Sequence, residues 1–203
     1  MLITGGASSV GMWAVQLAKL SGVGHIAATC GPGNAEFVQS LGAHEVLDYT
    51  QPGGDLTKWP ANRTKFDVVL DCVGGDALRG AWTVVREGGT LVSVVMPPEH
   101  RRPAEGVEKD VRPDFFVQGA NSYQMEEVSY LLEAGLAKTV VGAVYPLEEA
   151  QAAMDQANRG HGRGKVVLKV NQEDPRQLIE FLGKNGRLDD RDATERMLEE
   201  ADR

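Results

Sequence analysis

The strongest constraint on the fold of this 203-residue chain is an alternation of short apolar runs with stretches of helical periodicity. Strands are expected at residues 2–4, 25–29, 45–47, 66–70, 89–94 and 166–170. Helices are expected at residues 10–21, 35–41, 76–85, 124–134 and 147–157, with surface loops at 51–65 and 96–112. Alternating strands and helices of this length predict parallel βαβ units with right-handed crossovers. The sequence therefore predicts an α/β protein built on a doubly wound parallel sheet, followed by a C-terminal helical tail.

A glycine-rich segment, TGGASSVG at residues 4–11, lies between the first expected strand and the first expected helix. In that context a glycine-rich turn places backbone N–H groups and a helix N-terminus against a pyrophosphate. Against the pattern G-x-G-x-x-G, residues 6–11 have Ser8 in place of the middle glycine, and a serine hydroxyl can itself bond a phosphate oxygen. The segment predicts a dinucleotide site, the alternative being a turn that keeps only a packing role.

The end of the second expected strand bears on which dinucleotide is bound. NAD sites usually carry an acid about 20 residues past the glycines, where it bonds the ribose 2′-hydroxyl. Residues 29–34 contain no acid, which favours NADP(H) because no carboxylate repels a 2′-phosphate. No Lys or Arg lies between Lys19 and Lys58 to bind that phosphate. The remaining candidates are neutral donors or a remote base: Thr29, Asn34, Tyr49, Arg159, Arg163 and Lys165.

Composition excludes several classes of function. The chain has 29 acidic and 21 basic residues, a net charge of -8, so nucleic acid is not an expected partner. No apolar run approaches the roughly 18 residues that span a bilayer, so no membrane partner is expected. The two cysteines, Cys30 and Cys72, do not have the spacing of metal ligands. We therefore expect neither a disulfide framework nor a metal site. The N-terminus has no basic segment before an apolar core, so we expect no secretion signal and a cytoplasmic location.

These motifs together resemble the cofactor domain of the medium-chain dehydrogenase/reductase family, in its zinc-independent quinone oxidoreductase and enoyl reductase branch. The resemblance follows the family's order between residues 2 and 170. It is carried by segments that include GGASSVG (5–11), AVQLAK (14–19), FDVVLDCVG (66–74), YPLEEA (145–150) and GRGKVVL (162–168). It implies a Rossmann-type fold and an NADP(H) cofactor.

The resemblance also implies four groups of cofactor contacts. These are Ser8, Ser9 and Val10 at the pyrophosphate; Cys30, Asn34 and Tyr49 around the adenosine ribose and its phosphate; Cys72, Val73 and Gly74 along the nicotinamide ribose; and Phe115, Phe116 and Val117 at the carboxamide. No catalytic residue is predicted, because the four histidines are scattered along the chain. Asp71, at the end of the fourth strand, is expected either to bond nearby backbone or to take part in chemistry.

Three segments are expected: a Rossmann dinucleotide-binding domain at residues 1–144, a helix and strand at 145–170, and a charged helical extension at 171–203. In the family, the segment corresponding to 145–170 packs against an N-terminal GroES-like domain, and we expect this chain to lack that domain. The extension has ten acids and six bases. It is expected to be a solvated tail, a partner-binding or dimerising helix, or a partial replacement for the missing surface.

The resemblance implies an NADP(H)-dependent oxidoreductase of the quinone or enoyl reductase type, acting on a small-molecule substrate. Because we expect the family's substrate domain to be absent, we also expect activity to depend on a homodimer or on a partner that supplies it. Two alternatives stay open at this point: a nucleotide-binding remnant without catalysis, and a non-redox biosynthetic cyclase or isomerase that reuses the crevice of the fold.

Overall fold

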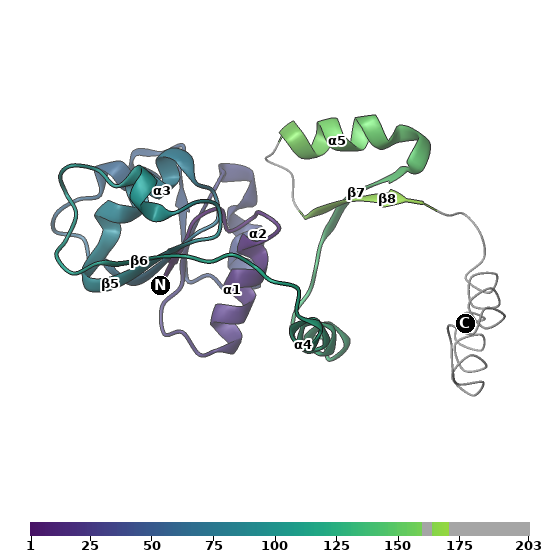
Figure 1. The fold of residues 1–203 in the computed structure, drawn as a ribbon, viewed down its shortest axis with the longest axis horizontal. Coiled ribbons are helices and arrows are strands. Elements are labelled where there is room, and N and C mark those ends of the chain that lie inside the picture. The colour runs from purple at the N-terminus through teal and green to yellow at the C-terminus, as the bar shows by residue number, and fades with distance from the viewer. Residues whose placement is uncertain (160–163, 171–203) are drawn as a thin grey trace.

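The structure is a computed structural model, and it describes residues 1–159 and 164–170. The expected extension at 171–203, and with it every expectation about the tail, lies outside the described residues, as does Arg163. The described chain forms a sheet domain and a smaller unit of one helix and two strands, with a further helix below them (Figure 1).

The sheet domain contains six strands, all parallel, in the order β3-β2-β1-β4-β5-β6. The winding reverses between β1 and β4, which confirms the doubly wound parallel sheet. Its strands are β1 (Leu2–Ile3), β2 (Ala27–Cys30), β3 (Glu45–Asp48), β4 (Phe66–Asp71), β5 (Val85–Ser93) and β6 (Arg112–Phe115). Its α-helices are α1 (Gly11–Leu20), α2 (Ala35–Leu41) and α3 (Gly75–Val84).

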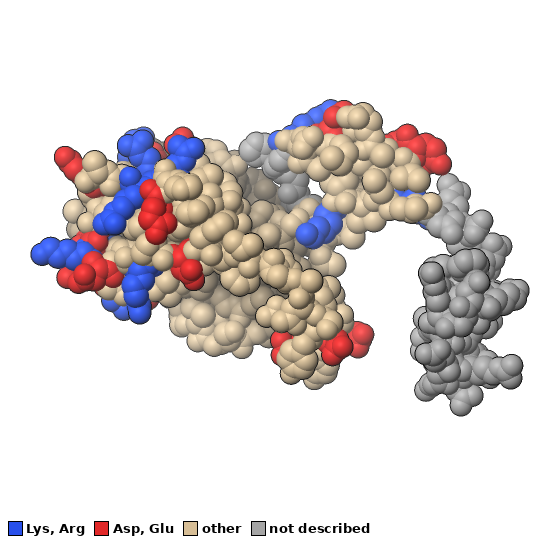
Figure 2. Space-filling model, in the orientation of Figure 1, with Lys and Arg blue, Asp and Glu red and all other residues tan. Residues whose placement is uncertain are grey.

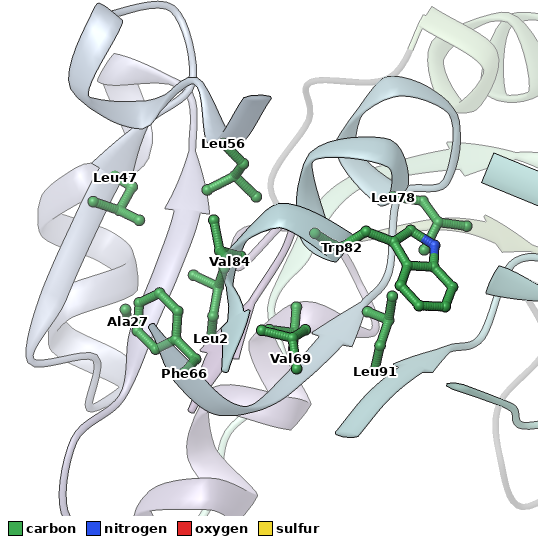
Figure 3. Close-up of a cluster of buried hydrophobic side chains, with 12 residues drawn as sticks. Leu2, Ala27, Leu47, Leu56, Phe66, Val69, Leu78, Trp82, Val84 and Leu91 are labelled. Atoms are coloured by element: carbon green, nitrogen blue, oxygen red, sulfur yellow. The ribbon is translucent and has the colours of Figure 1, made fainter. Parts of the chain in front are cut away.

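The two faces of the sheet are covered by different helices, because successive strand residues point to opposite sides. Leu2 and Val69 lie on one face in a cluster that includes Trp82 of α3 (Figure 3). Ile3 lies on the other face, in a cluster that includes Met12 of α1 and residues of α2. Both faces are therefore apolar, as expected for a parallel sheet buried between helices.

Short 3-10 helices lie within the segments expected to be loops. They are Pro52–Gly54, Leu56–Lys58 and Pro98–Arg101, and two more, Pro32–Asn34 and Leu147–Glu149, precede α2 and α5. The segment Leu56–Lys58 packs against α3, so part of the expected surface loop contributes Leu56 to the core.

The smaller unit follows α4 (Ser122–Glu133). It consists of the parallel strands β7 (Val141–Pro146) and β8 (Lys165–Lys169) with α5 (Ala150–Arg159) between them. Strand β7 was not predicted from the sequence, and the boundary expected between residues 144 and 145 falls inside it. The reason is physical: Gly142 interrupts the apolar run, and no residue of the strand is fully buried. The division into segments stays a prediction.

Two sets of hydrogen bonds tie the smaller unit and its linker to the sheet domain. The Gln16 side chain donates to the carbonyl of Lys138 at 3.0 Å and accepts from its N–H at 2.8 Å. The Ser9 hydroxyl donates to the carbonyl of Gly164 at 3.3 Å. These contacts bring β8 to the start of α1.

Charged side chains are unevenly distributed over the face shown in Figure 2. They gather at the end of the sheet domain farthest from α4, on α5, and on α4, where they are acidic; much of the surface between these groups is uncharged. Among residues 1–159 and 164–170, no helix has both the length and the apolar character needed to cross a membrane.

Candidate dinucleotide-binding site

A cleft of about 820 Å³ opens at the carboxyl ends of β1 and β2 and extends to the smaller unit. Its position beside the reversal of strand order is where open α/β sheets bind ligands. The sheet domain and the smaller unit both contribute to its walls. Among the residues that line it are Gly5, Ser8, Ser9, Thr29, Cys30, Asn34, Tyr49, Val73, Gly142 and Lys165.

The glycine-rich turn forms one wall of the cleft and is fastened to β2. Gly5 has a φ of +65°, which favours glycine, and its N–H donates to the Thr29 hydroxyl at 3.0 Å. The N–H of Gly6 donates to the Thr29 carbonyl at 2.8 Å. At Gly11 an added Cβ would lie 2.1 Å from the carbonyl oxygen of Gly5, so the first turn of α1 packs directly on the glycine backbone. Thr29 thus fastens the turn to β2, and its contact with a ribose phosphate stays a prediction.

The N-terminus of α1 offers donors to an anion. The Ser8 oxygen accepts from the N–H of Gly11 at 3.0 Å, which leaves the hydroxyl proton of Ser8 as a donor. The N–H groups of Ser9 and Val10 donate to no acceptor among the described residues. A helix N-terminus with unpaired N–H groups favours phosphate. The arrangement therefore fits a pyrophosphate, and the contacts of Ser8, Ser9 and Val10 with one stay predictions. Val10 is half exposed and is not among the lining residues.

The wall formed by the ends of β2 and β3 is neutral at three of the predicted positions. Cys30, Asn34 and Tyr49 all line the cleft, with Cys30 buried and the Tyr49 ring beside Gly31. The structure thus brings together the three residues predicted for the adenosine ribose. Their contacts with a cofactor stay predictions.

Lys165 is the one Lys or Arg among the described residues that line the cleft. It comes from β8, which is distant in sequence from the other walls. Of the remote bases that the sequence analysis named, Arg159 does not line the cleft. Choosing among these bases required the packing of the smaller unit onto α1, which no sequence pattern specifies.

The opposite wall is formed at the end of β4, where Val73 is 52% exposed and lines the cleft. Its neighbours Cys72 and Gly74 are not among the lining residues. Burial, and to a smaller extent the charge of Asp71, raises the pKa of the Cys72 thiol to about 12. This thiol is therefore protonated at neutral pH.

The residues predicted for the carboxamide follow β6. Phe115, Phe116 and Val117 are all exposed, and none of the three lines the cleft. The structure therefore does not bring them together with the glycine-rich turn in one cavity. Their contacts with a cofactor stay predictions as well.

Asp71 is fully buried at the carboxyl end of β4 and is held by donors from the end of β1, from β5 and from the turn after β4. Thr4 donates its hydroxyl to the carboxylate at 2.8 Å, and Ser93 does so at 2.9 Å. The N–H of Gly74 donates to both carboxylate oxygens, at 3.1 and 3.0 Å, and the N–H of Val73 donates at 3.3 Å. Of the two expectations for Asp71, bonding to nearby backbone is the one that the geometry shows.

Sequence reasoning missed the part of the cleft formed by residues 54–57 and by the start of α3. Asp55 lines the cleft, and its carboxylate is bonded by Thr57 and paired with Lys58, whose ammonium is 2.8 Å away. Hydrogen bonds from Lys58 and Thr57 hold the pKa of Asp55 below its ordinary value. The Asp-x-Thr spacing signals this local turn, but nothing in the pattern signals that the turn faces the cleft.

The fold and the glycine-rich turn define a Rossmann-type dinucleotide-binding domain. Comparison with known proteins identifies the family of this domain. A family described as zinc-binding dehydrogenase matches residues 41–168. The chain belongs to the medium-chain dehydrogenase/reductase superfamily, as a cofactor-binding domain of the quinone oxidoreductase-like type.

Individual relatives agree with this placement. The chain is 41% identical over 170 residues to a probable zinc-binding oxidoreductase, mitochondrial, of Arthroderma benhamiae, covering 83% of this chain and 51% of that protein. It is 29% identical over 196 residues to the NAD(P)H oxidoreductase RTN4IP1, mitochondrial, of Danio rerio, covering 85% and 49%. A solved quinone oxidoreductase from Coxiella burnetii superposes with a TM-score of 0.74 at 30% identity, covering 84% and 52%. The chain thus spans about half the length of the curated relatives it matches.

The family description names zinc. Zinc in proteins is held by clusters of Cys, His, Asp or Glu. No group of three or more such side chains in residues 1–159 and 164–170 is arranged to hold a metal ion. The described residues therefore do not fit zinc, and no chemical step is assigned to it here.

Proposed function

We propose that this chain binds NADP(H) and serves as the cofactor half of an oxidoreductase that transfers hydride between NADP(H) and a small-molecule quinone, enone or enoyl compound. The observation that carries the proposal is the cradle at the start of α1. There Ser8 and the N–H group of Ser9 are presented to a cleft large enough for a cofactor. Bound NADP(H) would supply the hydride, and the residues of this chain would bind and orient it.

The proposal names NADP(H) rather than NAD(H) because of the charges around the cleft. The end of β2 supplies Cys30 and Asn34 instead of the carboxylate that bonds a 2′-hydroxyl, and Asp55 is already paired with Lys58. Lys165 adds a positive charge to the same cleft. The Asp76 carboxylate also lines the cleft, so an additional phosphate is favoured only by Lys165 and by the absence of an acid at the end of β2.

Hydride transfer also needs a second wall that excludes water and orients the substrate. The smaller unit leaves Val144, Met154 and Val167 between 38% and 60% exposed. Exposed apolar side chains that gather on one unit favour a protein contact. We propose that a further domain or a second copy of the chain covers them and completes the substrate site. The cytoplasmic location is a separate prediction. The two curated relatives described above are named as mitochondrial, so cell fractionation is needed to test it.

The test is a fluorescence titration of the protein with NADPH and with NADH, repeated with two variants of β8. Lys165→Ala should weaken NADPH binding about tenfold and leave NADH binding nearly unchanged, because only NADPH carries the 2′-phosphate. Lys169→Ala is the matched control: it lies on the same strand, is exposed, and does not line the cleft. Cys30→Arg should tighten NADPH relative to NADH.

Turnover is measured separately, as NADPH oxidation with quinone and enone acceptors. Binding without turnover, even with a partner present, would favour a nucleotide-binding remnant. Absence of binding to either nucleotide would overturn the proposal and leave a non-redox use of the fold.

A further inference from the structure

The Asp71 carboxylate is the most deeply buried charged group of the cleft region. Its side chain has no solvent exposure, and no Lys, Arg or His of the described residues forms an ion pair with it. A buried charge without a counter-ion is costly unless hydrogen bonds satisfy it. All the groups around it are donors, which matches an ionised carboxylate because that form only accepts.

The bonds to Asp71 fix the direction of two hydroxyl groups. The Thr4 proton points to the carboxylate, so its oxygen accepts from the N–H of Cys72 at 2.9 Å. The Ser93 proton does the same, so its oxygen accepts from the N–H of Val95 at 3.1 Å and of Met96 at 3.4 Å. One anion therefore orders the backbone at the carboxyl ends of β1, β4 and β5.

This ordered backbone lies on the side of the cleft that the adenosine half of a dinucleotide does not occupy. The end of β2 is where an adenosine ribose is recognised, and the pyrophosphate fits at α1 between the two halves. The nicotinamide half is then left with the wall at the end of β4, where Val73 lines the cleft. Asp71 lies two residues from Val73 and accepts its N–H.

We propose that Asp71 is a positioning residue for the nicotinamide half of the cofactor, and that its buried charge favours the oxidised ring, which is positively charged, over the neutral reduced ring. The inference rests on the proposed function. An unpaired negative charge near the cleft attracts a cation and is screened little by salt when buried. The charge of Asp71 already acts on its neighbour Cys72, whose thiolate it disfavours.

The experiment measures the Kd of NADP⁺ and of NADPH by calorimetry for the wild type and for Asp71→Asn. The amide keeps the shape but removes the charge. We expect both affinities to fall, and the ratio of the two Kd values, NADP⁺ over NADPH, to rise at least about threefold. Asp67→Asn is the matched control, because it makes the same change on the same strand at an exposed ion pair with Arg86. It should leave both affinities unchanged.

A second variant tests the ordering of the backbone separately from the charge of Asp71. It also provides a test if Asp71→Asn does not fold. Ser93→Ala keeps the anion but releases the N–H groups of Val95 and Met96. It should speed amide exchange there and weaken both nucleotides equally, with the ratio unchanged. An unchanged Kd ratio in Asp71→Asn, or unchanged exchange and affinity in Ser93→Ala, would overturn the inference. Failure of the wild type to bind either nucleotide would instead refute the proposed function.

Discussion

Gly11 offers a sharp test of the cradle, because its substitution meets backbone and not a flexible side chain. In Gly11→Ala the new Cβ would lie 2.1 Å from the oxygen and 2.8 Å from the carbon of the Gly5 carbonyl, against an ordinary contact of at least 3.4 Å. The turn or the first residues of α1 must therefore move by roughly 1 Å. Overpacking of this kind costs about 1–3 kcal/mol. The same movement displaces the N–H groups of Ser9 and Val10, and a loss of about 1.4 kcal/mol in binding is tenfold in Kd.

The assay combines urea unfolding with NADPH titration. We expect Gly11→Ala to lower the free energy of unfolding by about 1–3 kcal/mol and to raise the NADPH Kd at least tenfold. Gly24→Ala is the matched control, since no atom lies within 4 Å of its added Cβ. Its stability should be equal to or slightly above that of the wild type. If Gly11→Ala bound NADPH as the wild type does, the cradle would not be the phosphate site.

Three further predictions concern charge, packing and ionisation. Ser8→Asp should abolish NADPH binding, measured by fluorescence, because it places a carboxylate beside the pyrophosphate; unchanged affinity would refute the site. Trp82→Ala should cost about 3–5 kcal/mol in urea unfolding, because the ring is fully buried and its N–H donates to Pro98 at 2.9 Å, whereas Tyr123→Ala, at an exposed ring, should cost little. Cys72 should react slowly with Ellman's reagent at pH 8, because its raised pKa keeps the thiol protonated. Folding stability should decline as pH rises from 9.0 towards about 12, because the thiol of the unfolded chain ionises first. Labelling of the native protein at the rate of the unfolded chain would contradict this.

The sheet domain was predictable because its signals are local. Helix α2 spans the predicted residues 35–41, ended by Gly42 with a φ of +120°. The start of β5 was not predicted: a strand was expected only from residue 89, yet β5 begins at Val85. Pairing with β4 extends the strand through a register shift, and Gly88, with a φ of +67°, lies within it. Tertiary pairing decided this boundary.

The candidate site was predictable only in part, because some of its residues are brought together by tertiary contacts. Ser8 and Ser9 lie in a contiguous motif, and its residue spacing alone predicts the geometry of the turn. Lys165 reaches the cleft through contacts between distant segments, such as that of Ser9 with Gly164, and spacing along the chain does not encode them. The side-chain donors to Asp71 likewise come from the end of β1 and from β5, which meet β4 only in the folded sheet.

The hydrogen bond from Ser9 to Gly164 has a thermodynamic consequence. The same helix start contacts a strand of the smaller unit and faces the cleft, so a molecule held there touches both parts of the protein. Its binding energy would then be shared between them, and ligand that binds only the folded form raises the melting temperature of each part it contacts. The empty protein would melt in two steps, and the filled one in a single cooperative transition, so the shape of a calorimetric trace would report occupancy.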